Sequence, residues 1–321
     1  MHYSGTMPEL PEVETIAAGV HARVHGARIV RVWTSGKPQT FKSSEDEIAQ
    51  VLTGARIARV RRVGKTIVMT VQCDNRRDTA KPGLVESKST TTAESSISFS
   101  IDCVDTNKAT VDANASVEPN VSVEFLIHLG MTGRLLVSAP EIPRAPHTHA
   151  VLTLDDAREI RFVDPRRFGR LSLHSEPTHY TGPGSEPLTI TLEDFIALFH
   201  SRRTPIKAAL LNQSLLHGIG NIYADESLFR ASIRPTRQAA RLTRAELALL
   251  RKSLVEVLRH AIKLGGSSVS DYVDADGARG FFQLQHKVYQ RTGQPCLTCN
   301  KLIRRITLAG RSTHFCPHCQ K

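Results

Sequence analysis

The chain has 321 residues, of which 40% are hydrophobic and 23% are charged, and its formal net charge is +11. No apolar run approaches the roughly 18 residues that a membrane span needs, and residues 1–6, MHYSGT, lack the charged and apolar regions of a signal peptide. These features argue against a membrane or secreted protein, and we expect a soluble, cytoplasmic chain with two domains.

The excess positive charge lies in the C-terminal part of the chain. Residues 1–200 have a balance of −2, whereas residues 201–321 contain 20 Lys and Arg against 7 Asp and Glu. A basic domain of this kind attracts a polyanion, because neutralising phosphates releases their counterions. The charge therefore predicts a polyanionic partner, with a surface that only aids solubility as the alternative.

The first motif, MPELPEVE, covers residues 7–14 and places a proline directly after a second methionine. An initiator methionine is usually removed before a small residue such as proline, so a chain begun at Met7 would mature with Pro8 at its N terminus. Residues 1–6 would then be a mis-assigned start or a removable leader. Apolar residues spaced by three and four over 11–25 predict an amphipathic helix that ends at Gly26.

Short apolar runs separated by turn residues follow this helix and predict a β-sandwich. The eight runs are 27–34, 55–63, 65–72, 121–131, 134–139, 149–154, 158–163 and 170–174. Residues 73–120 interrupt them with 13 Ser and Thr and one aromatic residue. Such a segment buries too little apolar surface to order itself, which predicts a disordered insertion between two neighbouring strands.

The rest of the chain changes to a helical period. Thr191 and Thr204 are predicted N-caps, and Thr243 with Glu246 forms a capping box ahead of a long helix that ends at Gly265. In HGIGNIYADE, residues 217–226, two glycines separate one helix from a new helix that begins after Asn221. Backbone amides at such a turn suit a phosphate, with plain helix packing as the alternative.

Four of the six cysteines have the spacing of a zinc site: a Cys-x-x-Cys pair, sixteen residues and a second pair. They are Cys296, Cys299, Cys316 and Cys319. Residues 301–315 alternate apolar and polar side chains around a turn at Ala309 and Gly310, which predicts a β-hairpin. Its tip would present Arg311 to a phosphate.

Together these motifs resemble the formamidopyrimidine-DNA glycosylases, bacterial enzymes that excise oxidised purines and nick the strand. The resemblance covers nearly the whole chain outside residues 1–6 and 73–120. It depends on PELPEVE (8–14), GK (64–65), HLGMTG (128–133), DPRRFG (164–169), GIGNIYADE (218–226), SDYVDADGARGFFQ (270–283) and the four cysteines.

The resemblance implies an α+β fold in three parts. These are an N-terminal β-sandwich flanked by helices (7–185), a helical helix-two-turn-helix domain (186–290) and a zinc-finger β-hairpin (291–321). It also implies double-stranded damaged DNA as the partner, bound between the first two parts, and one structural Zn²⁺ ion. We expect a monomer that associates with the nucleoid and not with a membrane.

The resemblance also assigns the chemistry of base excision and strand cleavage. Pro8, a secondary amine, would attack C1′ of the damaged nucleoside and leave an iminium (Schiff base) that drives β,δ-elimination. Glu9 would protonate the sugar ring oxygen. Lys65 would donate a proton in β-elimination and Arg311 in δ-elimination, and both cations could equally hold phosphates.

Further residues would bind DNA. Met131, Arg166 and Phe168 match the family's wedge, which fills the hole left by an extruded nucleotide; for Met131 and Phe168 the alternative is core packing. Phosphates would be held by Asn221, Lys207, Arg202 and His147. The loop at 265–282 would cover the extruded base.

Two other functions stay open at this stage. An endonuclease VIII-like enzyme shares the scaffold and favours oxidised pyrimidines, although Met131, Arg166 and Phe168 together favour the purine-directed branch. A non-catalytic binder of damaged DNA would result if the leader stayed attached, because the nitrogen of Pro8 would then be held in an amide.

Overall fold

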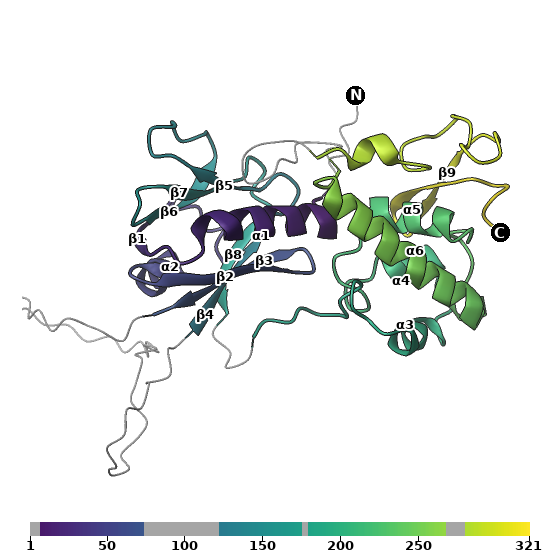
Figure 1. The fold of residues 1–321 in the computed structure, drawn as a ribbon, viewed down its shortest axis with the longest axis horizontal. Helices are drawn as coiled ribbons and strands as arrows, with labels where there is room; N and C mark the ends of the chain where they lie inside the picture. Colours follow the sequence, from purple (N-terminus) through teal and green to yellow (C-terminus); the bar gives the residue numbers. More distant parts are fainter. Residues whose placement is uncertain (1–6, 74–121, 175–178, 268–279) are drawn as a thin grey trace, which may run out of the picture.

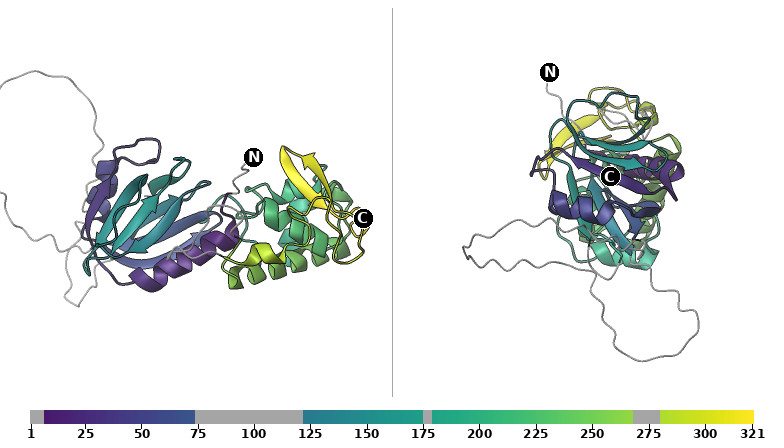
Figure 2. Two further views of the ribbon diagram at one scale, coloured as in Figure 1. Left: turned by 90° about the horizontal axis from the view of Figure 1, so that it is seen from above. Right: turned by 90° about the vertical axis from the view of Figure 1, so that its left-hand side faces the viewer.

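The computed structural model describes residues 7–73, 122–174, 179–267 and 280–321. Residues 1–6, almost all of the insertion predicted at 73–120 and most of the loop predicted at 265–282 lie outside these ranges. The chain forms a β-sandwich and a helical body that lie next to each other along the longest axis (Figures 1 and 2). In the described ranges, no helix has both the length and the apolar content needed to cross a membrane.

The sandwich consists of two four-stranded antiparallel sheets with the strand orders β1-β6-β7-β5 and β2-β3-β4-β8. The strands confirm the eight predicted runs to within a few residues at their ends. They are β1 (Ile29–Thr34), β2 (Arg56–Val63), β3 (Thr66–Gln72), β4 (Ser122–His128), β5 (Arg134–Ser138), β6 (Thr148–Leu154), β7 (Glu159–Val163) and β8 (Arg170–His174). Because β3 pairs with β4, the predicted insertion joins neighbouring strands of one sheet.

Side chains from both sheets fill the core of the sandwich. Successive residues of a strand point to opposite faces, so the β-branched and aromatic residues at alternate positions meet between the sheets. Phe125 on β4 and Phe162 on β7 are each 2% exposed and belong to this core. The sandwich is thereby a rigid support for the loops at its ends.

Helix α1 (Leu10–Val24) connects the two bodies (Figure 1). It begins with a capping box in which Glu9 and Glu12 each bind the backbone of the other. The face predicted from the sequence, from Val13 onward, packs in the sandwich core, whereas Leu10 packs in the core of the helical body. The first turn of α1 therefore lies where the two bodies meet.

The helical body contains α3 (Leu192–Phe199), α4 (Ile206–Leu210), α5 (Asn221–Arg230), α6 (Arg244–Lys263) and two 3₁₀ helices, Ala239–Arg241 and Phe282–Gln285. The N-cap at Thr191 and the capping box of Thr243 with Glu246 are confirmed. The N-cap predicted at Thr204 is wrong, because Pro205 is the cap. Pro205 is held in an extended conformation by a bridge to Gln238, which moves the helix start past it.

Two other helix starts differ from the prediction. Helix α5 begins at Asn221 itself, with Gly220 as its N-cap, one residue earlier than expected. Helix α2 (Glu45–Leu52), which Ser44 caps, was not predicted. It buries only Ile48 and Leu52, so its apolar period is too short to stand out in the sequence.

The C-terminal segment forms the predicted hairpin of β9 (Arg304–Leu308) and β10 (Arg311–Phe315). Ala309 and Gly310 both have positive φ, 48° and 72°, as a two-residue hairpin turn of type I′ requires. The hairpin packs against α5, and a small core that includes Val288 and Ile303 lies beneath it. The predicted domain boundaries 7–185, 186–290 and 291–321 stay a prediction.

Candidate functional site

The N-terminal ends of α1 and α5 meet around the carboxylate of Glu9, next to Pro8. The amides of Ile222 and Tyr223, in the first turn of α5, donate to the two carboxylate oxygens at 3.1 and 3.4 Å. A Cβ at Gly220 would lie 2.2 Å from Glu9 Cδ, so only glycine allows this approach. Helix N-termini favour negative charge, and here one helix offers its amides to a carboxylate on another.

Burial gives Glu9 an unusual protonation equilibrium. Its side chain is only 3% exposed, and burial raises its pKa to about 7 against the opposing effect of the Lys65 charge. At neutral pH the carboxyl group is therefore divided between its protonated and ionised forms. A group with this pKa can give up a proton at physiological pH, as a general acid must.

Glu12, for which the sequence suggested no role, lies beneath Glu9. Its carboxylate accepts hydrogen bonds from the Tyr223 hydroxyl, from the Ser267 amide at 2.7 Å and from the Glu9 amide at 2.9 Å. Burial raises the pKa of Glu12 as well. One carboxylate thus joins α1, α5 and the segment that follows α6.

Lys65 lies within electrostatic reach of both Glu9 and Arg311. Burial lowers the pKa of Lys65; the charge of Glu9 opposes this and that of Arg311 adds to it. Lys65 follows Gly64 in the tight turn between β2 and β3. The ring of His128, another residue without a predicted role, contacts the Lys65 carbonyl through Nδ1 at 3.1 Å. The structure therefore brings the four predicted catalytic residues together at the junction of the two bodies.

Glycines allow this junction to close. Gly64 has a φ of +59°, and a Cβ there would lie 2.6 Å from Nδ1 of His217. The next residue, Gly218, has a φ of +89°, and its carbonyl accepts the Leu10 amide at 3.0 Å. The GK turn of the sandwich and the HGIGN segment of the helical body are thus in direct contact.

The three predicted wedge residues lie on two adjoining loops of the sandwich. Phe168 is 47% exposed, so its alternative, core packing, is wrong. The guanidinium of Arg166 lies over its ring, 4.8 Å from the centroid. Met131 is half-buried on the other loop. A Cβ at Gly130 would lie 2.6 Å from the carbonyl carbon of Phe168, which shows how closely the loops approach.

The other predicted phosphate contacts are spread over the molecule. Asn221 donates to the Ser312 hydroxyl at 3.2 Å, next to Arg311, and so belongs to the group around Glu9. His147 is exposed, and its carbonyl accepts the Asp164 amide at 3.0 Å, which places it beside the wedge loops. Arg202 is exposed between α3 and α4, and its side chain donates to the Leu198 carbonyl at 2.7 Å.

Lys207 corrects a prediction. Its side chain is completely buried, and its ammonium contacts Asp225 at 2.7 Å, the Ser312 carbonyl at 2.7 Å and the Thr313 hydroxyl at 2.9 Å. An ammonium has three N–H donors, and three oxygens surround this one. Because Asp225 also accepts the His314 amide at 2.9 Å, the pair holds the hairpin on the helical body instead of holding a phosphate.

The four predicted cysteines lie together at the base of the hairpin. Their sulfur atoms are all within 4.8 Å of one another, with Cys296 to Cys319 at 3.9 Å and Cys299 to Cys316 at 3.5 Å. Zn–S bonds of about 2.3 Å in a tetrahedron place sulfurs about 3.8 Å apart. The group fits one structural Zn²⁺ ion held by four thiolates.

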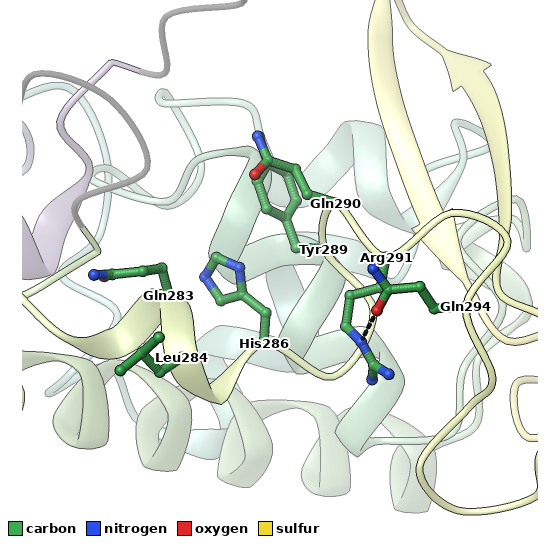
Figure 3. Close-up of a pocket in the computed structure, with 7 residues that line it drawn as sticks. All are labelled: Gln283, Leu284, His286, Tyr289, Gln290, Arg291 and Gln294. Carbon is green, nitrogen blue, oxygen red and sulfur yellow. Dashed lines mark hydrogen bonds between the residues drawn. The ribbon is translucent and has the colours of Figure 1, made fainter.

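A cavity of about 490 Å³ lies along the segment that connects the helical body to the hairpin. Figure 3 shows the side chains around it, which are Gln283, Leu284, His286, Tyr289, Gln290, Arg291 and Gln294. The rings of His286 and Tyr289 lie edge to face, with centroids 5.4 Å apart. Burial lowers the pKa of His286 to about 4, so its ring is neutral at physiological pH.

Models of three protein families match the chain in succession. They are the formamidopyrimidine-DNA glycosylase N-terminal domain over residues 7–171, the formamidopyrimidine-DNA glycosylase H2TH domain over 182–273 and the zinc finger found in FPG and IleRS over 293–321. The first match begins at Met7, and the third contains all four cysteines.

Curated relatives and solved structures cover almost the whole chain. The formamidopyrimidine-DNA glycosylases of Solibacter usitatus (strain Ellin6076) and Gluconobacter oxydans (strain 621H) are 39% and 37% identical to it, over 98% of this chain and 100% of each relative. A mutant of Lactococcus lactis FPG in complex with Fapy-dG containing DNA has a TM-score of 0.77 at 28% identity, over 98% of this chain and 100% of that one. MutM (FPG) from Thermus thermophilus has a TM-score of 0.73 at 34% identity, over 98% of both chains.

The raised pKa of Glu9 predicts how stability depends on pH. Glu9 is neutral in both the folded and the unfolded chain below pH 4.5, and between pH 4.5 and about 7 the folded state loses stability because it must bury a charge. Glu9→Gln cannot ionise. We therefore expect the stability of the 321-residue variant relative to the wild type to rise by roughly 3 kcal/mol between pH 4.5 and pH 8 in urea unfolding. A difference in stability that does not change between these two pH values would contradict this account.

The pairing of Lys207 with Asp225 makes a second prediction. Lys207→Met leaves the Asp225 charge buried without its cation, which should lower the free energy of unfolding by about 3–5 kcal/mol. The double variant Lys207→Met, Asp225→Asn should recover much of this loss in the same urea titration. A single variant as stable as the wild type would show that the ammonium serves a surface ligand instead.

Removal of the metal should unfold the hairpin alone. The buried core beneath it consists of Val288, Ile303 and two of the cysteines, with Phe229 packed against them, which is too small to stay folded without the ion. Native mass spectrometry should find one zinc per chain, and a chelator should make residues 291–321 sensitive to protease while the sandwich stays resistant. A hairpin that stays protected after complete metal loss would refute the assignment.

Proposed function

Because the chain belongs to the formamidopyrimidine-DNA glycosylase family, a family of base-excision-repair DNA glycosylases, we propose that it is a bifunctional enzyme. It excises oxidised purines such as 8-oxoguanine and formamidopyrimidines from double-stranded DNA, and it then cleaves the strand by β,δ-elimination. The observation that carries this proposal is the buried carboxyl of Glu9, whose pKa is raised to about 7, directly beside Pro8.

The first chemical step joins Pro8 to the sugar. A secondary amine with a pKa near 8 is partly uncharged at neutral pH, and its lone pair adds to C1′ while the bond from C1′ to the base breaks and the base takes that electron pair. The N–H proton of Pro8 is then lost and neutralises the departing base. Glu9 gives its proton to the ring oxygen O4′ as the bond from C1′ to O4′ opens. The product is an iminium, in which the nitrogen of Pro8 is doubly bonded to C1′.

The iminium then acts as an electron sink. A secondary amine cannot lose a proton from this state to become a neutral imine, so the positive charge persists and favours loss of the 3′ phosphate and then the 5′ phosphate. The cations that would assist these two departures are Lys65, which lies within electrostatic reach of both Glu9 and Arg311, and Arg311 itself. Asn221, hydrogen-bonded to Ser312, would hold a backbone phosphate beside them.

The mechanism requires that Pro8 be the first residue of the mature enzyme. While Met7 is attached, the nitrogen of Pro8 is held in an amide and has no nucleophilic lone pair. The family match begins at residue 7, so Pro8 is the second residue of the matched segment. Residues 1–6 lie outside the described residues, and their removal is part of the proposal.

The DNA-binding part of the proposal combines charge with two groups of residues. Residues 201–321 supply 20 Lys and Arg, and the solved Lactococcus lactis relative was crystallised with damaged DNA. Met131, Arg166 and Phe168 would enter the duplex from the sandwich, while the group around Glu9 receives the extruded nucleotide.

Substrate choice has one competing candidate. A further structure of wild-type Lactococcus lactis FPG contains DNA with an oxidised pyrimidine. We therefore treat oxidised pyrimidines as the second substrate class for this chain, behind oxidised purines, and covalent trapping on the two kinds of duplex compares them directly.

Borohydride trapping tests the proposal. Protein produced to begin at Pro8 should form a reduced covalent cross-link with a duplex that contains 8-oxoguanine opposite cytosine, and less with thymine glycol. Protein that retains Met1–Met7 should form none. Stronger trapping on thymine glycol would favour the pyrimidine branch, and equal trapping with the leader attached would exclude Pro8 as the nucleophile.

Two variants separate the roles within this experiment. Pro8→Gly keeps a primary amine at the terminus, so it should bind DNA normally and turn over more slowly. Glu9→Gln, begun at Pro8, keeps the nucleophile but lacks the acid. It should trap on a pre-formed abasic site and fail on 8-oxoguanine; full excision by Glu9→Gln would remove Glu9 from the mechanism.

A further inference from the structure

The two wedge loops cross between the sheets at the same end of the sandwich. Residues 129–133 lead from β4 to β5, and residues 164–169 lead from β7 to β8. Strand pairing sets them next to each other, because His128 is opposite Arg170 in one sheet and Arg134 is opposite Val163 in the other. The loops thus begin and end on paired residues.

Asp164 is the first residue of the second loop, and its side chain is fully buried. Its Oδ1 accepts the hydroxyl of Thr132 at 2.6 Å and the amide of Arg166 at 3.3 Å, and its Oδ2 accepts the amide of Gly169 at 2.7 Å. Thr132 belongs to one loop, and Arg166 and Gly169 belong to the other. One carboxylate therefore hydrogen-bonds both loops at once.

Asp164 has no ion-pair partner among the described residues, so neutral donors alone stabilise its carboxylate. Burying a carboxylate in this way is costly unless it is well hydrogen-bonded. An asparagine would offer one acceptor oxygen, and its NH₂ group would face the backbone amide of Arg166 or of Gly169, which can only donate. The site is therefore specific for a carboxylate.

The backbones of the two loops are also in contact. A Cβ at Gly130 would lie 2.6 Å from the amide nitrogen of Gly169, and a Cβ at Gly169 would lie 2.5 Å from the ring of Phe162. The loops have no room to slide past each other. Asp164 supplies the polar link in a contact that is otherwise backbone against backbone.

Each predicted wedge residue is close to a group that Asp164 binds. Met131 precedes Thr132, Arg166 donates its own amide, and Phe168 precedes Gly169. We propose that Asp164 is a positioning residue that holds Met131, Arg166 and Phe168 as one rigid unit, so that all three enter the duplex together. This inference depends on the wedge role that the proposed function gives to these residues.

The direct test measures how the wedge residues enter the duplex, and it does not depend on base excision or strand cleavage. A duplex carries 2-aminopurine opposite a tetrahydrofuran abasic analogue, and its fluorescence rises when binding unstacks the probe. We expect Asp164→Asn to lose at least half of the wild-type rise at saturating protein, and Thr132→Val, which removes only the link between the loops, to lose a smaller part. Thr132→Ser retains the hydroxyl and should recover most of what Thr132→Val loses.

Cleavage rates on two substrates distinguish a loss of wedge positioning in Asp164→Asn from a general loss of the fold. On duplex DNA with 8-oxoguanine, Asp164→Asn should lower kcat at least tenfold, since the three wedge residues are displaced. On a single-stranded abasic oligonucleotide, which has no stack to enter, its cleavage rate should stay within twofold of the wild type. Asp155→Asn, in the exposed turn between β6 and β7, controls for the loss of one negative charge.

Two results would overturn the inference: a full fluorescence rise with Asp164→Asn, or an equal loss of rate on the duplex and the single strand. Failure of the proposed function looks different. In that case the wild type itself cleaves neither substrate, while the fluorescence of the bound duplex still decides whether Asp164 positions the wedge.

Discussion

The structure depends on the burial of one carboxyl group between two helix N-termini. Glu9 begins α1, and the first amides of α5 bind its oxygens, so the contact joins the sandwich to the helical body at the residue beside Pro8. The same burial raises the pKa of Glu9 to about 7. The contact between the two bodies and the raised pKa of Glu9 therefore have one physical cause, the exclusion of water from this carboxyl group.

Helix α5 also binds other segments of the chain through polar side chains along its length. Tyr223 binds Glu12 of α1, Asp225 binds Lys207 and the backbone of His314, and Glu226 accepts the amides of residues 287–289. Three polar side chains within four residues thus bind four different segments of the chain, namely α1, α4, β10 and residues 287–289. These contacts explain how α5 can bury the charged residues Asp225 and Glu226 of the IYADE sequence.

The sequence predicted local features well because they have local causes. The strands follow from alternating apolar residues, the capping box at Thr243 from its spacing to Glu246, and the zinc site from Cys-x-x-Cys pairs. The errors concern partners that are distant in sequence. The family resemblance gives Lys207 to a phosphate, whereas Asp225 and the hairpin backbone that bind it in this chain are brought there only by the fold.

Buried charges at these positions fix register, which apolar packing alone does poorly. Ser312 and Thr313 both bind Lys207, and Asp225 holds the next residue. A slip of β10 by one residue would break all of these contacts and would turn Arg311 to the opposite face of the hairpin. The zinc ion fixes only the base of the hairpin, so the buried pair is what fixes the direction of Arg311 at its tip.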